Sequence, residues 1–185
     1  MVMENQAKQK SASPARKGYS QKSREGRMDS EFKQEIVDLA RVTRVMAGGK
    51  RMRFRACVAI GDGKGRVGMG VAKGADVTLA VNKAVAKARK NMVTVPFVNE
   101  TIPYAVTEKF GSAIILLKPA PKGTGVKAGG PLRMVFELAG VRNIVGKILG
   151  SKNKINNVTA ALQAIKSLRL IEVKPREEKN IKQVK

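Results

Sequence analysis

The stretch RMRFRACVAI, residues 51–60, is the feature that most constrains how this chain can fold. Apolar side chains occupy every second position, and arginines occupy the first positions between them. Because successive side chains of a strand point to opposite faces, this alternation predicts a half-buried strand. The face expected to be buried carries Met52, Phe54, Ala56, Val58 and Ile60. The face expected to be open carries Arg51, Arg53, Arg55, Cys57 and Ala59.

The residues that follow predict a hairpin and then a helix. Glycine adopts positive φ without steric cost, so GDGKGR at 61–66 predicts a turn and the alternation at 67–72 predicts the returning strand. Asp76 is expected to cap a helix that ends near Asn91. The apolar stripe of this helix is expected to comprise Val77, Val81, Ala84, Val85 and Ala88. Upstream, residues 35–46 fit either a helix or a strand, and their β-branched later part favours a strand.

The second half of the chain predicts another set of strands and helices. The expected strands are residues 92–98, 102–106, 112–118 and 141–149, with a hairpin loop at 108–111. Pro96 makes the first of them an edge strand or ends it early. A Pro/Gly loop at 119–131 ends at Pro131, which suits the first position of a helix that stops at Gly140. Asn156 or Asn157 is expected to cap a last helix.

These patterns predict an α+β protein with two domains, at residues 31–95 and 96–169. Residues 1–30 form a basic arm with almost nothing to bury, and residues 170–185 form a charged tail. The arm could bind nucleic acid or simply aid solubility. Because each half has its own strands and helix, we expect fragments 31–95 and 93–169 each to unfold cooperatively.

The charge of the chain indicates its class of partner. Its 37 Lys and Arg against 14 Asp and Glu give a formal net charge of +23, which favours a polyanion such as nucleic acid. A membrane surface is the alternative, but no basic helix has a large aromatic or leucine-rich face. No apolar run has the length of a membrane span and no secretory signal is present, which predicts a cytoplasmic protein.

The sequence contains few of the residues that catalytic sites commonly use. Histidine is absent and Cys57 is the single cysteine, which disfavours nucleophile–base pairs and the usual metal sites. Gly63, Gly65 and Gly68 match G-x-G-x-x-G, but they lie in a turn and a strand rather than before a helix. We therefore expect no enzyme activity, no cofactor, no metal and no small-molecule substrate. A nucleotide-dependent enzyme stays as an alternative that ATP or NAD binding would reveal.

The basic residues around the first hairpin favour phosphate contacts with folded RNA. Residues 44–66 contain a single acid, Asp62, and aromatic residues make up only 4% of the chain, which disfavours base stacking. The candidate RNA-binding residues are Arg44, Gly48, Gly49, Lys50, Arg51, Arg53, Arg55, Lys64, Arg66, Lys73, Lys83, Lys87, Lys90, Lys122 and Lys127.

Residues 31–169 resemble a known family, bacterial small-subunit ribosomal protein five, through two long motifs in the same order. The first motif comprises Gly49, Lys50, Phe54, Ala56, Ile60, Gly61, Asp62, Gly65, Val67, Gly68, Gly70, Asp76, Val77, Ala80 and Val81. The second motif comprises Gly123, Gly125, Gly129, Gly130, Arg133, Glu137, Ala139, Gly140, Asn143, Gly150, Ser151, Asn153 and Asn156.

This resemblance implies a fold and a role. The N-terminal domain would be like a double-stranded-RNA-binding domain, with three antiparallel strands packed on one helix, and the C-terminal domain would be an α/β sandwich. The protein would be a structural constituent of the small ribosomal subunit that binds small-subunit rRNA and supports assembly and translational accuracy near the decoding region. The implied partners are small-subunit rRNA, small-subunit ribosomal proteins four and eight, and messenger RNA at its entry path, with no membrane.

The resemblance also implies particular surfaces. The loop 48–51 would lie beside the rRNA region where spectinomycin-class antibiotics bind. Gly125, Arg133 and Glu137 would form an interface with a partner protein, on the segment that faces ribosomal protein four. A free-standing double-stranded-RNA-binding chaperone is the alternative function, and co-sedimentation with small subunits in high salt would discriminate between the two.

Overall fold

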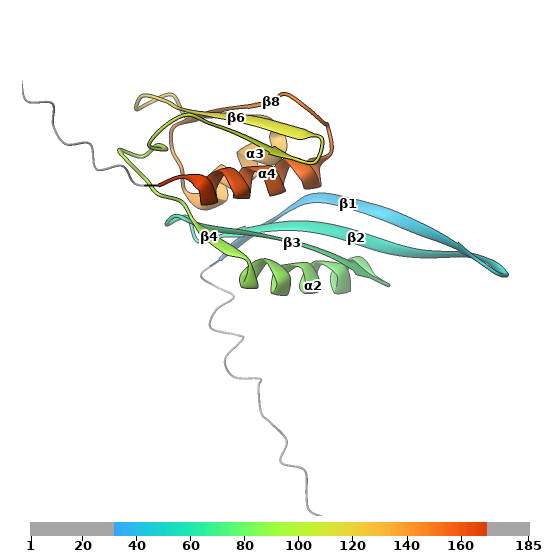
Figure 1. The fold of residues 1–185 in the computed structure, drawn as a ribbon. Helices are drawn as coiled ribbons and strands as arrows, with labels where there is room; N and C mark the ends of the chain where they lie inside the picture. The colour runs from blue at the N-terminus through green and yellow to red at the C-terminus, as the bar shows by residue number, and fades with distance from the viewer. Residues whose placement is uncertain (1–31, 170–185) are drawn as a thin grey trace, which may run out of the picture. The chain divides into compact units, whose positions relative to one another are not determined.

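The structure is a computed structural model that describes residues 32–169. The predicted arm at 1–30 and the predicted tail at 170–185 lie outside the described residues. All described residues belong to one compact unit. Within residues 32–169 the fold is α+β, with two four-stranded sheets and three helices (Figure 1). Within residues 32–169, no helix is both long and apolar enough to cross a lipid bilayer.

The first sheet is antiparallel and has the strand order β1-β2-β3-β4. Its elements are β1 (Lys33–Met46), β2 (Gly49–Gly61), β3 (Arg66–Gly74), the helix α2 (Val77–Lys90) and β4 (Met92–Thr94). The predicted hairpin of 51–60 and 67–72 is thus confirmed. The ambiguous segment is a strand along its whole length, because it pairs with β2 from Lys33 opposite Gly61 to Met46 opposite Gly49.

Helix α2 packs on one face of this sheet through small residues. Ala80, Ala84 and Ala88 are fully buried, whereas the predicted stripe residue Val77 is only partly buried. A Cβ atom at Gly70 on β3 would overlap the carbonyl oxygen of Ala84. Glycine on the strand and alanine on the helix therefore let the two backbones approach closely. Asp76 occupies the predicted N-cap position, but its side chain makes no capping hydrogen bond.

The second sheet has the order β5-β6-β8-β7, and only the β7–β8 pair is parallel. Its elements are β5 (Val106–Phe110), β6 (Ala113–Pro119), β7 (Val126–Lys127), α3 (Gly130–Ala139), β8 (Ile144–Ile148) and α4 (Lys154–Ser167). The predicted stop of the helix at Gly140 is confirmed, since Gly140 is a left-handed C-cap with φ 82°.

Two details of the second half were predicted wrongly. The first strand of the hairpin is Val106–Phe110 rather than 102–106, because the tight turn consists of residues 111 and 112, with φ +59° at Gly111, and pairs Phe110 with Ala113. The last helix is capped by Asn153, whose side chain accepts a hydrogen bond from the Ile155 amide at 3.2 Å. Asn157 is instead buried inside the helix and donates to the Ser151 carbonyl at 3.0 Å.

The hydrophobic core explains why the arginine-bearing face of β2 is more buried than the sequence predicts. One cluster of buried residues joins α2 to the first sheet, and a larger cluster joins the other face of that sheet to α3, α4 and the second sheet. Cys57 and Ala59, expected on an open face, are fully buried in the larger cluster with Phe136 of α3. The alternation itself was right, but the second half of the chain covers this part of the face. Burial raises the pKa of the Cys57 thiol to about 11 and the nearby Asp38 carboxylate adds to the rise, so the thiol stays protonated.

Candidate nucleic-acid interface

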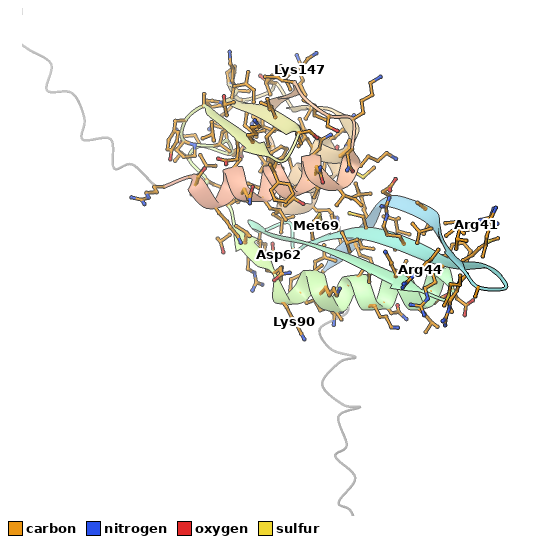
Figure 2. The ribbon with its side chains drawn as sticks, turned by 45° about the vertical axis from the view of Figure 1, so that its right-hand side comes forward. Arg41, Arg44, Asp62, Met69, Lys90 and Lys147 are labelled. Atoms are coloured by element: carbon orange, nitrogen blue, oxygen red, sulfur yellow. The ribbon has the colours of Figure 1, made fainter. Side chains whose placement is uncertain are left out.

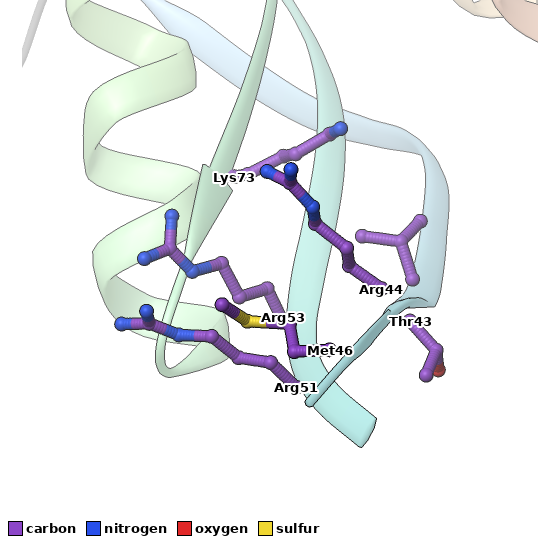
Figure 3. Close-up of a pocket in the computed structure, with 7 residues that line it drawn as sticks. Thr43, Arg44, Met46, Arg51, Arg53 and Lys73 are labelled. Carbon is purple, nitrogen blue, oxygen red and sulfur yellow. The ribbon is translucent and has the colours of Figure 1, made fainter. Parts of the chain in front are cut away.

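A basic hollow lies on the face of the first sheet opposite α2, where the second half leaves the sheet uncovered. Figure 3 shows the side chains around it, from β1, β2 and β3. The lining residues are Val42, Thr43, Arg44, Met46, Arg51, Arg53 and Lys73. We call Arg44, Arg51, Arg53 and Lys73 the hollow cations. All four are exposed, and no acid among residues 32–169 lines the hollow.

Strand register explains why the hollow cations meet. Arg44 lies directly opposite Arg51, and Lys73 lies opposite Arg55, which shares a face of β2 with Arg51 and Arg53. Like charges directly opposite one another across a sheet are destabilising. Within residues 32–169, none of the hollow cations forms an ion pair with an acid. The arrangement therefore favours binding of an anion that neutralises them.

Arg55 has a different environment from the hollow cations. Its Nη2 atom lies 3.2 Å from Asp38 Oδ2, and its side chain is only 33% exposed. Lys154 at the start of α4 lies 3.4 Å from the other oxygen of the same carboxylate. Asp38 follows an irregularity in the β1–β2 register that re-aims the strand at this point. Arg55 thus contributes to contacts within the chain as well as to the basic face.

Lys64 lies in the turn after β2 and Arg66 begins β3, and Asp62 organises this junction. The Asp62 carboxylate accepts hydrogen bonds from the Lys64 amide at 2.8 Å, the Arg66 amide at 2.9 Å and Arg66 Nε at 2.7 Å. Burial alone would raise the pKa of Asp62, but these hydrogen bonds and the Arg66 charge outweigh it, and the pKa is lowered. The Arg66 guanidinium also stacks over the Phe32 ring, 5.6 Å from its centroid.

The glycines of the G-x-G-x-x-G match do not open a helix. The Gly63 amide donates to the Leu138 carbonyl at 3.0 Å, and the Gly65 amide donates to the Ala139 carbonyl at 2.9 Å. Both acceptors are at the C-terminal end of α3, which carries the negative end of the helix dipole. A phosphate would be repelled there, so this geometry argues against a nucleotide site at the turn.

The α2 lysines lie on the other side of the sheet from the hollow. Lys83, Lys87 and Lys90 are exposed, and Lys87 Nζ donates to the Val71 carbonyl at 3.2 Å. Figure 2 shows Arg44 toward the free end of the β1–β2 hairpin and Lys90 at the far end of α2. The predicted RNA-binding residues of this half therefore occupy two faces rather than one.

The remaining predicted residues are distributed over loops and α3. Gly48 and Gly49 form the hairpin tip with φ +85° and +144°, and nothing lies within 4 Å of a Cβ built at either, so the tip next to exposed Lys50 is open. Lys122 and Lys127 are exposed on the second half.

An exposed ion pair marks the predicted partner interface on α3. Arg133 Nε lies 2.6 Å from the Glu137 carboxylate, and this bond raises the pKa of the arginine.

Asn143 is a site residue whose function the residue patterns did not reveal. Its buried side-chain oxygen accepts hydrogen bonds from the backbone amides of Gly123, at 3.0 Å, and Gly125, at 3.2 Å. These two bonds shape the glycine-rich loop. The Gly125 carbonyl in turn accepts the Ile144 amide at 3.2 Å. A lone asparagine between a helix and a strand carries no local signal for a contact with a loop that precedes it by so many residues.

Two family models match this chain in sequence order. The model described as the N-terminal domain of ribosomal protein S5 matches residues 32–96, and that for the C-terminal domain matches residues 108–178. The chain belongs to the ribosomal protein S5 family. Within it, the small ribosomal subunit protein uS5c of Spinacia oleracea is 46% identical over 153 residues, which are 82% of this chain and 50% of that protein. The chain thus spans about half the length of this curated relative.

The S5 family matches divide the site residues between them. The N-terminal match contains the basic hollow, the hairpin tip and α2, and the C-terminal match contains the Asn143-organised loop and the Arg133–Glu137 pair. The domain boundaries at 31–95 and 96–169, and the RNA-binding and partner-binding roles of the individual residues, stay predictions.

Proposed function

We propose that this chain is a structural constituent of the small ribosomal subunit that binds small-subunit rRNA. The observation that carries the proposal is the basic hollow, where four exposed cations gather on one sheet face and no acid of the described residues joins them. Phosphates supply the sign and spacing of charge that such a face needs. Membership of the S5 family supports the ribosomal setting.

The finer role follows from the family and the surfaces. We propose that the first sheet with α2 acts as a domain like those that bind double-stranded RNA, reading the shape of rRNA rather than its sequence. The hairpin tip at 48–51 reaches into rRNA, and the segment with Gly125, Arg133 and Glu137 contacts a neighbouring small-subunit protein. Ribosomal proteins four and eight are the proposed neighbours, messenger RNA passes nearby, and these contacts support assembly and accuracy.

The salt dependence of rRNA binding tests the hollow directly. Each phosphate contact contributes a slope of about −0.9 in a plot of log affinity against log salt, by analogy with duplex DNA. The double variant Arg51→Gln/Arg53→Gln should flatten this slope by about two contacts in filter binding to an rRNA fragment. The matched control, Lys109→Gln/Lys166→Gln, removes the same charge at exposed residues away from the hollow and should leave the slope nearer to that of the unchanged chain.

Two results would contradict the proposal. Equal slopes for the hollow variant and the control would show that the hollow does not bind phosphates. Failure of the unchanged chain to co-sediment with small subunits in high salt would contradict a structural role in the subunit, even if the chain binds free rRNA.

A further inference from the structure

The turn between β2 and β3 contacts the end of a helix from the other half of the chain. We call residues 62–65 the capping turn. Its Gly63 and Gly65 amides donate to the carbonyls of Leu138 and Ala139, at 3.0 and 2.9 Å. The last carbonyls of any helix lack partners within the helix and must find them elsewhere. Here the capping turn supplies two of those partners.

Helix α3 satisfies its other terminal carbonyls locally. The Gly140 amide donates to Glu137 and Phe136, and the Val141 amide donates to Phe136 at 3.0 Å. This is the pattern of a helix that ends in a left-handed glycine. The local cap and the capping turn therefore divide the end of α3 between them, so that four successive carbonyls from residue 136 to residue 139 are bonded.

The contact is too close to admit side chains on either backbone. A Cβ atom at Gly61 would overlap the Leu138 carbonyl, and a Cβ atom at Gly140 would overlap the Gly63 carbonyl. In both cases the overlapped atom is backbone, which cannot rotate aside as a flexible side chain can. The two segments are thus shaped for each other, which an incidental surface contact would not require.

Other contacts support the capping turn or join the two halves elsewhere. The Val95 amide donates to the Gly65 carbonyl at 2.7 Å, which ties the start of the connecting segment to the same turn. Leu138 and Phe136 of α3 share a buried cluster with Cys57 and Ala59 of β2. The ion pair between Lys154 and Asp38, at 3.4 Å, joins α4 to β1 at another place.

We propose that the capping turn, which belongs to the first half of the chain, completes the end of α3 in the second half. This contact makes the two family-matched domains one cooperative folding unit. Gly63 and Gly65, the first two glycines of the G-x-G-x-x-G match, serve this docking, because their amide donors are already used by α3. The inference concerns folding and holds whichever polyanion the chain binds. It runs against the expectation from the sequence that fragments 31–95 and 93–169 unfold separately.

Hydrogen exchange of the unchanged full chain provides the first test. If the halves unfold together, the Gly63 and Gly65 amides should exchange within about tenfold of the slowest amides of β2 and β8, because all open only by global unfolding. Chemical denaturation should give one transition that both halves share. Exchange of these two amides hundreds-fold faster than the core, or two separate transitions, would overturn the proposal without any variant.

A variant then tests the capping turn itself. Gly61→Ala places a Cβ against the Leu138 backbone and should speed exchange of the Gly63 and Gly65 amides by roughly tenfold or more, the equivalent of at least one lost hydrogen bond. The matched control is Gly130→Ala, where nothing lies within 4 Å of the added Cβ, and exchange at the turn should not change. Unchanged exchange in Gly61→Ala, or equal acceleration in both variants, would overturn the assignment of the turn as the cap.

Discussion

At the scale of single residues, Asn143 and Asp62 each fix the conformation of a loop by accepting hydrogen bonds from its backbone amides. Asn143 accepts hydrogen bonds from two amides of the glycine-rich loop, and Asp62 accepts them from the amides of Lys64 in the capping turn and Arg66 at the start of β3. Position 125 favours glycine because its backbone has a positive φ of +73°. Steric crowding is not the reason, since no described atom lies within 4 Å of a Cβ built there. The loop is therefore shaped from inside the chain before any partner binds.

Replacing the Asn143 acceptor should destabilise the chain. Asn143→Leu keeps a similar volume but leaves the Gly123 and Gly125 amides without their acceptor, which should lower the free energy of unfolding by about 1–3 kcal/mol. Asn143→Asp keeps an oxygen in place and should cost less. Urea denaturation of both variants measures the difference, and equal losses would show that the two hydrogen bonds do not matter to stability.

At the scale of elements, the first sheet uses its two faces differently. One face carries α2 through glycine and alanine contacts, and the other is covered by α3 toward one end and open at the basic hollow toward the hairpin tip. Phe54, expected to be buried, is only half-buried because α2 does not extend over the whole of β2. Close packing is therefore concentrated where β3 and α2 cross.

A side chain at the β3–α2 contact should be poorly tolerated. Gly70→Ala would place its Cβ against the Ala84 carbonyl, and moving a helix backbone to relieve such overpacking costs about 1–3 kcal/mol. The comparison is Gly130→Ala, an exposed helical position with open space, which should be neutral or slightly stabilising. Denaturation midpoints check both, and a Gly70→Ala chain as stable as the original would mean that α2 is free to shift.

At the scale of the whole molecule, the net charge and the hydrophobic core have opposite effects on the stability of the compact state. The buried cluster shared by both sheets favours one compact unit, whereas a net charge of +23 on 185 residues opposes compaction through self-repulsion. Part of that excess is concentrated at the hollow, where register holds like charges together. A bound polyanion would relieve this repulsion, so the free chain is expected to be less stable than the bound one.

Salt should therefore stabilise the free chain. Raising NaCl from about 0.1 M to about 1 M shortens the Debye length from about 10 Å to about 3 Å and screens the repulsion. A gain of about 1 kcal/mol would raise the melting temperature by about 2–4 °C for a chain of this size. Arg51→Gln/Arg53→Gln should show a smaller rise in a thermal scan, and a melting temperature that falls with salt would contradict the idea that repulsion limits stability.

The local features of the chain were determined by its sequence alone. The alternation at 51–60, the turn glycines, the helix start after Asp76 and the stop at Gly140 all depend on the strand period or on backbone freedom within a few residues. Those rules act locally, so the hairpin, the helix and the α+β class could be predicted. The gathering of Arg51 and Arg53 on one face could be predicted for the same reason.

The tertiary structure determined the burial and hydrogen bonding of residues that contact segments distant in the sequence. Cys57 and Ala59 are buried in a cluster to which α3, α4 and the second sheet contribute, and Arg55 differs from Arg53 in its contact with Asp38, which Lys154 also approaches. The glycines at 63–65 resemble a phosphate loop until α3 is placed against them. Local patterns carry no information about such partners, because burial and hydrogen bonding there are set by which segment packs alongside.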